Sequence, residues 1–168
     1  GINFISLAVN DPSISTMSDL LEVLGAEASF VVWQRPDNGQ FIVYSRDLSP
    51  SSAANGPVLG GVGYLVVALA PVSATLFGPP WPQDSVELRA GVNLIGLTRD
   101  DPGLRRLSDF ESRIGAAFQQ AIALDAEAQR FVSFLPFFDP ESPINRPVSI
   151  GNGYIIVTNF PRTLTFEG

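Results

Sequence analysis

The chain contains no cysteine, no histidine and no lysine. Without Cys or His it cannot form a zinc site of the usual kind, ligate haem or an iron–sulfur cluster through these residues, or use a thiolate or an imidazole in catalysis. Without Lys it can form no Schiff base and lacks the lysine of a P-loop. These absences exclude most familiar active sites, so we expect a protein that is not an enzyme and has no cofactor.

Charge is also scarce. Only 16% of the 168 residues are charged, the net charge is −7, and all ten positive residues are scattered arginines. A nucleic-acid partner is therefore not expected, because no basic run is present to attract a phosphate backbone. Apolar residues make up 45% of the chain, enough for a substantial core. The low fraction of charged residues predicts that some apolar surface contacts a partner.

The chain resembles itself when it is shifted by 90 residues. Residues 1–78 and 91–168 share 23 identities in 78 positions without a gap, and GINFISL (residues 1–7) falls on GVNLIGL (residues 91–97). The identities lie at residue types typical of turns and cores. We predict a tandem duplication, with repeat 1 over 1–78, a linker with a lead-in strand over 79–90, and repeat 2 over 91–168.

Each repeat is predicted to fold as β-α-β-β-β-β. The elements expected in repeat 1 are a strand over 2–9, a helix over 15–24, strands over 30–34 and 41–45 around an Asn-Gly turn, and strands over 64–70 and 74–77. The fold class is mainly β (α+β), with antiparallel strands, one short helix in each repeat, and pseudo-twofold symmetry. The alternation over 86–90 predicts a strand leading into Gly91. The equivalent before Gly1 is missing, so either an upstream segment or a partner chain supplies it.

Residues 116–130 present a conflict. Their composition, AAFQQAIALDAEAQR, favours a helix by propensity alone. In the repeat they align with a strand and the Asn-Gly turn of the first copy. We follow the repeat and predict strand.

Residues 61–78 form an uncharged stretch that opens on Gly-x-Gly. A membrane span is rejected because the equivalent residues 151–168 include Arg162 and Glu167. A dinucleotide-binding turn is rejected because each Gly-x-Gly leads into β-branched and aromatic residues rather than a helix. We therefore predict a glycine turn followed by a strand in both copies, and no transmembrane span.

The motifs GINFISL, GVNLIGL, GVGYLVV and GNGYIIV together resemble a repeat of large exported bacterial proteins, often read there as GWNLISLP and GKGYWV. The family usually has Pro at the positions of Ala8 and Thr98, and Trp at those of Leu65 and Ile155. The resemblance covers both halves and implies a secreted or surface-attached β-rich accessory module. It implies an extracellular, cell-surface or periplasmic location, which agrees with our interpretation of a chain starting at Gly1 as processed or excised.

Several recurring polar and glycine positions are interpreted as structural. We expect Asn3 and Asn93 to hold the backbone of a neighbouring turn, and Tyr64 and Tyr154 to be core residues with hydrogen-bonded hydroxyls. The four turn glycines are Gly61, Gly63, Gly151 and Gly153.

Acidic groups occur at 100–101, at 109 and 111, and at 139 and 141, but none has EF-hand spacing. Calcium binding stays open. A carboxylate pair for glycoside hydrolysis is the remaining catalytic alternative.

The aromatic residues give two functional hypotheses. The candidate protein interface is a cluster in repeat 2: Phe131, Phe134, Phe137 and Phe138. The candidate carbohydrate contacts, if exposed, are Trp33, Tyr44 and Trp81. Repeat 2 has Ala123 and Phe134 in place of Trp33 and Tyr44, which argues against two equivalent sugar sites. We expect a non-catalytic exported module that assembles with a protein partner or with itself; a carbohydrate-binding module, with a polysaccharide ligand, is the alternative.

Overall fold

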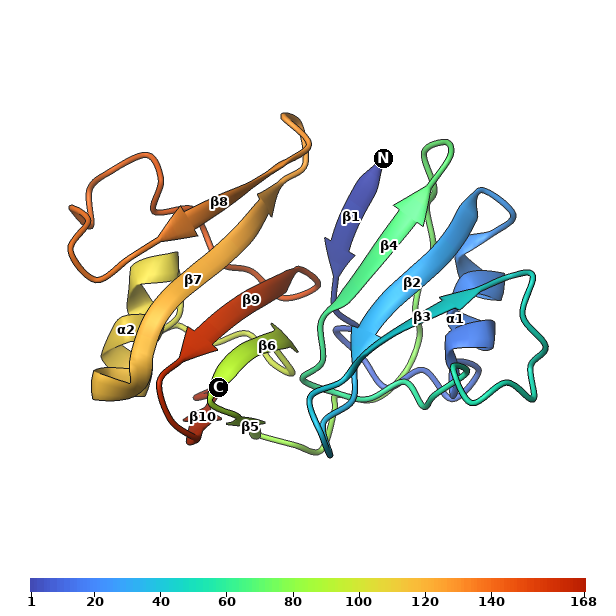
Figure 1. Cartoon of the computed structure of the whole chain (residues 1–168), viewed down its shortest axis with the longest axis horizontal. Coiled ribbons are helices and arrows are strands. Elements are labelled where there is room, and N and C mark those ends of the chain that lie inside the picture. The colour runs from blue at the N-terminus through green and yellow to red at the C-terminus, as the bar shows by residue number, and fades with distance from the viewer.

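The computed structural model describes residues 1–168 and shows a mainly β chain with two short helices (Figure 1). The elements are β1 (Ile2–Ile5), α1 (Met17–Leu24), β2 (Ala28–Gln34), β3 (Phe41–Ser45), β4 (Tyr64–Ala68), β5 (Ser85–Leu88), β6 (Gly91–Gly96), α2 (Leu107–Ile114), the 3-10 turn η1 (Gly115–Ala117), β7 (Phe118–Asp125), β8 (Arg130–Phe134), β9 (Gly153–Thr158) and β10 (Arg162–Thr165). We call residues 1–78 half 1, and residues 79–168, which include β5, half 2.

Each half contains a four-stranded antiparallel sheet. The strand order is β1-β4-β2-β3 in half 1 and β6-β9-β7-β8 in half 2, and every pairing is antiparallel. Corresponding elements begin 90 positions apart: α1 at Met17 and α2 at Leu107, β2 at Ala28 and β7 at Phe118. Half 2 has in addition the two-stranded sheet β10-β5. The predicted α+β class with antiparallel strands is confirmed.

The helices begin at matching caps. Asp19 accepts hydrogen bonds from the N–H of Thr16 at 2.8 Å, and Asp109 does the same for Arg106 at 2.8 Å. These carboxylates satisfy backbone donors at the helix start that have no partner within the helix. The pKa of Asp19 lies below its ordinary value, chiefly because Ser15 donates a hydrogen bond to it.

Each helix packs on one face of its own sheet and forms a separate core. In half 1, Leu20 and Leu21 of α1 belong to the same core as Val31 of β2. In half 2, Phe110 of α2 packs against Tyr154 of β9, with ring centroids 5.7 Å apart. In Figure 1 both helices lie behind the strands of their own sheets, α2 toward the left end of the molecule and α1 toward the right end. The other face of each sheet is left without a helix.

The two tyrosines predicted to be core residues lie in these cores. The hydroxyl of Tyr64 accepts from the N–H of Leu59 and donates to its carbonyl, and Tyr154 makes the same pair of bonds with Ser149. Burial raises the pKa of both hydroxyls above the ordinary value of 10.0. The loop before each of these strands is therefore fixed to the core by one phenol.

The structure decides the conflict over residues 116–130 in favour of strand, because β7 and β8 occupy most of this range. The prediction of a strand over residues 74–77 is wrong: this segment of half 1 is not in a sheet, whereas the equivalent β10 pairs with β5. An extended segment becomes a strand only when a neighbour satisfies its backbone. The first strand ends at Ile5, earlier than residue 9. Neither eight-residue helix has the length or apolar character to cross a bilayer.

Candidate functional site: the outer face of the two sheets

The face of each sheet that is turned away from its helix is also apolar. Side chains alternate between the two faces of a strand. In β2, Val31 and Trp33 lie in the core, so Phe30 and Val32 lie on the opposite face. In β9, Ile156 lies in the core, and Ile155 and Val157 lie opposite. An open antiparallel sheet normally has polar residues at such positions.

We define the outer face by the strand positions opposite the two helix-covered cores. The register of the pairings places these side chains beside one another, as in Val32 opposite both Val43 and Leu65, and Ile122 opposite Ile155. Its apolar members are Ile2, Phe4, Phe30, Val32, Phe41, Val43, Leu65, Val67, Val92, Leu94, Ile122, Leu124, Phe131, Ile155 and Val157. The polar members are uncharged: Gln34, Ser45, Gln120 and Ser133. The outer face therefore carries no charge on its strands.

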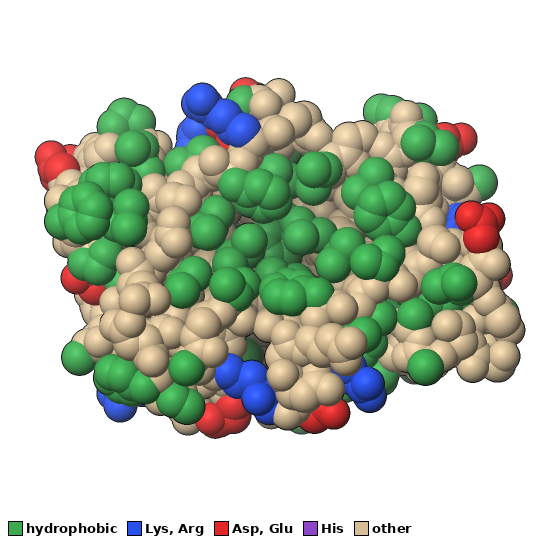
Figure 2. Space-filling model, viewed as in Figure 1, with side chains coloured by type: hydrophobic (Ala, Val, Ile, Leu, Met, Phe, Trp, Pro, Cys, Tyr) green, Lys and Arg blue, Asp and Glu red, His purple; other side chains and the backbone are tan.

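Several of these side chains are widely accessible. Val43 is 52% exposed, Phe41 48%, Phe131 42% and Val92 42%. Figure 2 shows hydrophobic side chains gathered across the middle of this side of the molecule, over both sheets, with charged side chains mainly near its margin. Monomeric proteins rarely expose contiguous apolar surface of this kind unless it contacts another molecule.

The two halves meet at this face. Phe4 of β1 and Phe131 of β8 pack edge to face, with ring centroids 6.5 Å apart. A Cβ at Gly63 or at Gly153 would collide with the Phe4 ring. Glycine is therefore required at both positions, because the ring lies over Gly153 and because the backbone carbonyl of Ile95, as well as the ring, lies over Gly63.

Two glutamines satisfy the free edges of the sheets at the junction. The amide of Gln34 donates to the carbonyl of Val92 at 2.8 Å and accepts from the N–H of Leu94 at 2.9 Å. The amide of Gln129 makes a similar pair of hydrogen bonds with Ile2: its oxygen accepts from the N–H of Ile2, and its nitrogen donates to the carbonyl of Ile2. Each half thus contributes one side-chain amide that occupies a backbone donor and acceptor on the edge strand of the other, groups to which an added strand would otherwise bond.

Backbone contacts across the junction are reciprocal. The N–H of Ser6 donates to the carbonyl of Gly151 at 2.8 Å, and the N–H of Gly96 donates to that of Gly61 at 3.0 Å. Ser6 and Gly96 are 90 positions apart, and so are Gly61 and Gly151. The two hydrogen bonds are therefore equivalent to each other under the 90-residue offset. The outer faces of the two sheets are therefore held in a fixed relation and present one surface.

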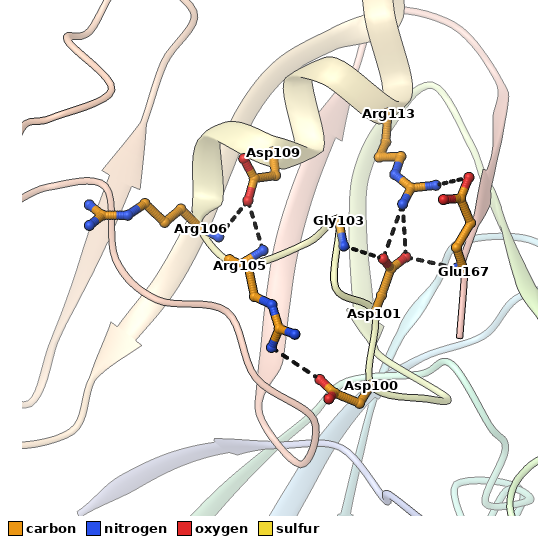
Figure 3. Close-up of polar contacts among 8 residues, drawn as sticks. All are labelled: Asp100, Asp101, Gly103, Arg105, Arg106, Asp109, Arg113 and Glu167. Atoms are coloured by element: carbon orange, nitrogen blue, oxygen red, sulfur yellow. Dashed lines mark hydrogen bonds and ion pairs between the residues drawn. The ribbon is translucent and has the colours of Figure 1, made fainter.

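The largest group of charged contacts lies elsewhere, around α2 (Figure 3). The carboxylate of Asp101 is fully buried and binds Arg113 at 3.0 Å, the N–H of Gly103 at 2.7 Å and the N–H of Glu167 at 2.8 Å. Arg113 also pairs with the side chain of Glu167 at 2.7 Å. Both carboxylate oxygens of Asp101 are thus engaged, and Oδ2, which bonds both Arg113 and the N–H of Glu167, ties the C-terminal segment to α2.

The acidic residues considered for calcium do not converge. In Figure 3, Asp109 points to the backbone at the start of α2 and Asp100 to the side chain of Arg105. No group of three or more acidic side chains in the structure has metal-site geometry.

The phenylalanines predicted as one interface are separated by the structure. Phe131 lies on the outer face, but Phe134 is 1% exposed in the core, on the opposite face of β8. Phe137 is 78% exposed in the following loop, where it packs edge to face on the partly buried Phe138. Phe134 therefore presents no exposed ring to a partner, because the two-residue period of β8 turns it inward.

The rings considered for carbohydrate binding are in the core of half 1. Trp33, Tyr44 and Trp81 are all buried, and the indole of Trp81 donates to the carbonyl of Leu7 at 2.8 Å. A sugar-binding platform needs an exposed ring face, so these three residues do not form one in this structure.

The residues interpreted as structural lie at turns and strand contacts. Asn93 binds the backbone of Arg89 at both its N–H and its carbonyl. Asn3 makes no hydrogen bond through its side chain. Gly61 and Gly151 have positive φ, +77° and +89°, a region that favours glycine.

Sequence reasoning missed most of the outer face. The available signal was the absence of alternation in β4 (YLVVA) and in the IIV segment of β9, because strands that are apolar at every position are typical of sheets covered on both faces. Comparison of the chain with protein-family models, with curated proteins and with solved structures found no match.

Proposed function

We propose that this chain is a non-catalytic, exported accessory or structural module that mediates protein–protein assembly through the outer face of its two sheets. The observation that carries the proposal is the extent of this face: uncovered, uncharged on its strands and continuous across the junction at Phe4 and Phe131. The expected exported location comes from the resemblance of its GINFISL and GNGYIIV motifs to repeats of exported bacterial proteins.

A second copy of the chain is the partner that suits this surface. An interface between two apolar sheets excludes water from both faces at once, as in the sheet-on-sheet packing of β-sandwiches. The face carries no charge that would select an oppositely charged partner, and closed twofold dimers are the commonest assemblies of identical chains. Self-assembly through the outer face would also account for the low charge content of the whole chain.

We further propose that the two halves arose by tandem duplication and are related by a pseudo-twofold axis. Three observations support this: the ungapped identities between residues 1–78 and 91–168, the matching strand orders, and the reciprocal bonds Ser6 to Gly151 and Gly96 to Gly61. Duplication doubles the area of outer face that one chain presents, which strengthens an interface built on apolar burial.

Sedimentation equilibrium tests the assembly. The chain should associate to a dimer with a dissociation constant in the micromolar range or below, as expected for an interface of standard size. Val43→Arg, on the outer face, should weaken association at least tenfold, because it buries an unpaired charge in an apolar contact. Phe137→Arg changes a more exposed apolar residue that lies off this face and should leave association unchanged.

Circular dichroism should show both variants folded. A chain that stays monomeric up to about 100 µM, well above a micromolar dissociation constant, would contradict self-assembly. Disruption by Phe137→Arg with no effect of Val43→Arg would move the interface from the outer face to the loop after β8.

A further inference from the structure

The chain contains three Asn-Gly pairs: Asn38-Gly39, Asn55-Gly56 and Asn152-Gly153. Asparagine is a thermolabile residue. A following glycine leaves the asparagine side chain most open to attack by the next backbone nitrogen, because glycine has no Cβ to obstruct it. Since the two residues of each pair are the same, a difference in reactivity between the pairs has to come from the structure.

The pair at Asn55 is held by contacts distant in the sequence. Asn55 Oδ1 accepts from the N–H of Ser18 at 2.8 Å, and Asn55 Nδ2 donates to the carbonyl of Pro50 at 2.8 Å. A Cβ at Gly56 would collide with the indole of Trp33, so this ring lies directly against the glycine. The side chain of Asn55 can turn toward its glycine only if the loop leaves both α1 and the core of half 1.

The pair at Asn152 is held at the junction between the halves. Asn152 Nδ2 donates to Ser149 Oγ at 2.8 Å, and the carbonyl of Asn152 accepts from Ser6 Oγ at 3.0 Å. Gly153 is buried at the start of β9, beneath the ring of Phe4. Attack by the nitrogen of Gly153 therefore requires the junction to open.

The pair at Asn38 lies at the exposed tip of the β2–β3 hairpin. Asn38 Oδ1 accepts from the N–H of Gln40 at 2.9 Å, and its Nδ2 makes no hydrogen bond. The N–H of Gly39 donates to the carbonyl of Arg35 at 2.8 Å. Both bonds lie within the turn, so fraying of the hairpin tip releases them without the opening of any core.

This turn, below β2 in Figure 1, is also part of the contact between the halves. Gln34 Nε2 donates to the carbonyl of Gly39 at 3.0 Å and to that of Val92 in β6 at 2.8 Å. Arg89, which follows β5, donates from Nε to the carbonyl of Pro36 at 3.0 Å. The backbone of the turn therefore positions Gln34 against β6 and is itself bound by a side chain of half 2.

The equivalent turn of half 2 lacks the Asn-Gly pair. Ala128 and Gln129 occupy the positions of Asn38 and Gly39, and Gln129 binds Ile2 of half 1. One of two equivalent turns therefore carries the reactive pair, and the other provides a control within the same molecule.

We propose that Asn38 is a modification site, at which the chain deamidates and isomerises spontaneously, and that the isoaspartyl product releases the β2–β3 turn from half 2. The backbone nitrogen of Gly39 attacks Cγ of Asn38 and forms a C–N bond. The side-chain nitrogen takes up the proton of the Gly39 N–H and leaves as ammonia. Water then opens the cyclic succinimide: cleavage of its bond to Cγ gives aspartate, and cleavage of its bond to the backbone carbonyl carbon gives isoaspartate.

The isoaspartyl product changes the geometry of the turn. One methylene group enters the main chain ahead of Gly39, and the former backbone carbonyl carbon becomes a carboxylate beside it. The turn is closed by the N–H of Arg35, which donates to the carbonyl of Gln40 at 2.9 Å, and a longer main chain displaces the carbonyl of Gly39 within that closure. Gln34 therefore loses its bond to Gly39 and holds β6 less firmly.

Peptide mapping after storage at neutral pH and physiological temperature tests the site. Trypsin cleaves after arginine but not before proline, so the three pairs fall in different peptides: residues 1–46, 47–89 and 131–162. Fragmentation mass spectrometry locates the change, and enzymatic methylation of isoaspartyl carboxylates measures isomerisation. In the native chain Asn38 should react at least about tenfold faster than Asn55 or Asn152, because opening a hairpin tip breaks fewer contacts than opening a core or the junction. In guanidinium chloride the three pairs should react at similar rates.

Hydrogen exchange tests the release of the turn. The N–H of Leu94 donates to Gln34 Oε1 at 2.9 Å, and after storage it should exchange faster, in proportion to the isoaspartate content. The N–H of Ile2 is held in a similar way by Gln129, in the contact that lacks the reactive pair, and its exchange should not change.

Two variants separate the modification from other effects of storage. Asn38→Ser retains an acceptor for the N–H of Gln40, and after the same storage it should show neither isoaspartate in the turn nor faster exchange at Leu94. Freshly prepared Asn38→Asp carries the added charge without the added methylene. Its Leu94 should exchange as in the unmodified chain.

The results that would overturn the proposal are distinct from those that bear on the outer face. Reaction of Asn55 or Asn152 as fast as Asn38 in the native chain would contradict the structural selection of the site, and so would an Asn38 that stays intact in the native chain. Unchanged exchange at Leu94 in chains that contain isoaspartate would contradict the release of the turn. The outer-face assembly does not depend on Asn38 and is unaffected by any of these results.

Discussion

Phe4 of β1 and Phe131 of β8 pack edge to face across the junction between the two halves, with an interplanar angle of 75°. Phe4 is almost fully buried and Phe131 is 42% exposed. The pair couples the halves at the centre of the outer face. The same two side chains therefore contribute to the stability of the chain and to the shape of its proposed interface.

Phe4→Ala should lower the free energy of unfolding by about 3 kcal/mol, because it leaves a cavity over two glycines that cannot fill it. Phe131→Ala should cost less, since its ring is partly in solvent. A double-mutant cycle measured by urea unfolding should give a coupling energy of about 1 kcal/mol. Additive effects would mean that the two rings do not interact across the junction.

The buried ion pair in half 2 gives a second prediction. Arg113→Met should lower the free energy of unfolding by about 3 kcal/mol, because it leaves the fully buried carboxylate of Asp101 without its cation. Arg105→Met removes the partner of the exposed Asp100, at 3.5 Å, and should cost less than about 1 kcal/mol. Chemical denaturation of the two variants provides the comparison; equal losses would contradict the structural role assigned to Asp101.

Stability should fall when the pH is lowered through the acid range. Hydrogen bonds from Ser13 and from the N–H of Phe77 hold the pKa of Asp11 below its ordinary value of 3.8, and a hydrogen bond from Ser15 does the same for Asp19. A pKa that is lower in the folded state stabilises the protein above the unfolded pKa, and the contribution disappears as the pH falls through the folded value. Unfolding free energies between pH 7 and pH 2 should decline below about pH 4, and Asp19→Asn should flatten the decline. An unchanged slope in that variant would contradict the capping role of its carboxylate.

The elements that could be predicted from the sequence are those specified by local signals. The strand from Phe41 to Ser45 follows from an Asn-Gly turn, and each helix follows from apolar residues at helical spacing and ends before a glycine. The strand β7 could be predicted only from the repeat, because its local composition favours a helix. Its pairing with β8 and β9 outweighs that propensity.

The elements that could not be predicted depend on partners distant in the sequence. Residues 74–77 have the pattern of a strand but no neighbour to pair with, and pairing cannot be derived from the segment itself. The outer face was missed for a related reason: apolar side chains such as Val43 and Ile155 suggest burial, and only the positions of the two helices show which face lacks a cover. The phenylalanines of residues 131–138 were grouped by proximity in sequence, although the alternation of β8 separates Phe131 from Phe134.

The most direct test of the proposed assembly is a methyl NMR spectrum recorded at two protein concentrations, about tenfold below and tenfold above the dissociation constant from sedimentation. The methyl signals of outer-face residues such as Val43, Ile122 and Ile155 should shift with concentration, while those of the core residues Leu20 and Ile156 should not. This result would place the contact between copies on the outer face. Spectra that are identical at both concentrations, or shifts confined to other surfaces, would contradict the account.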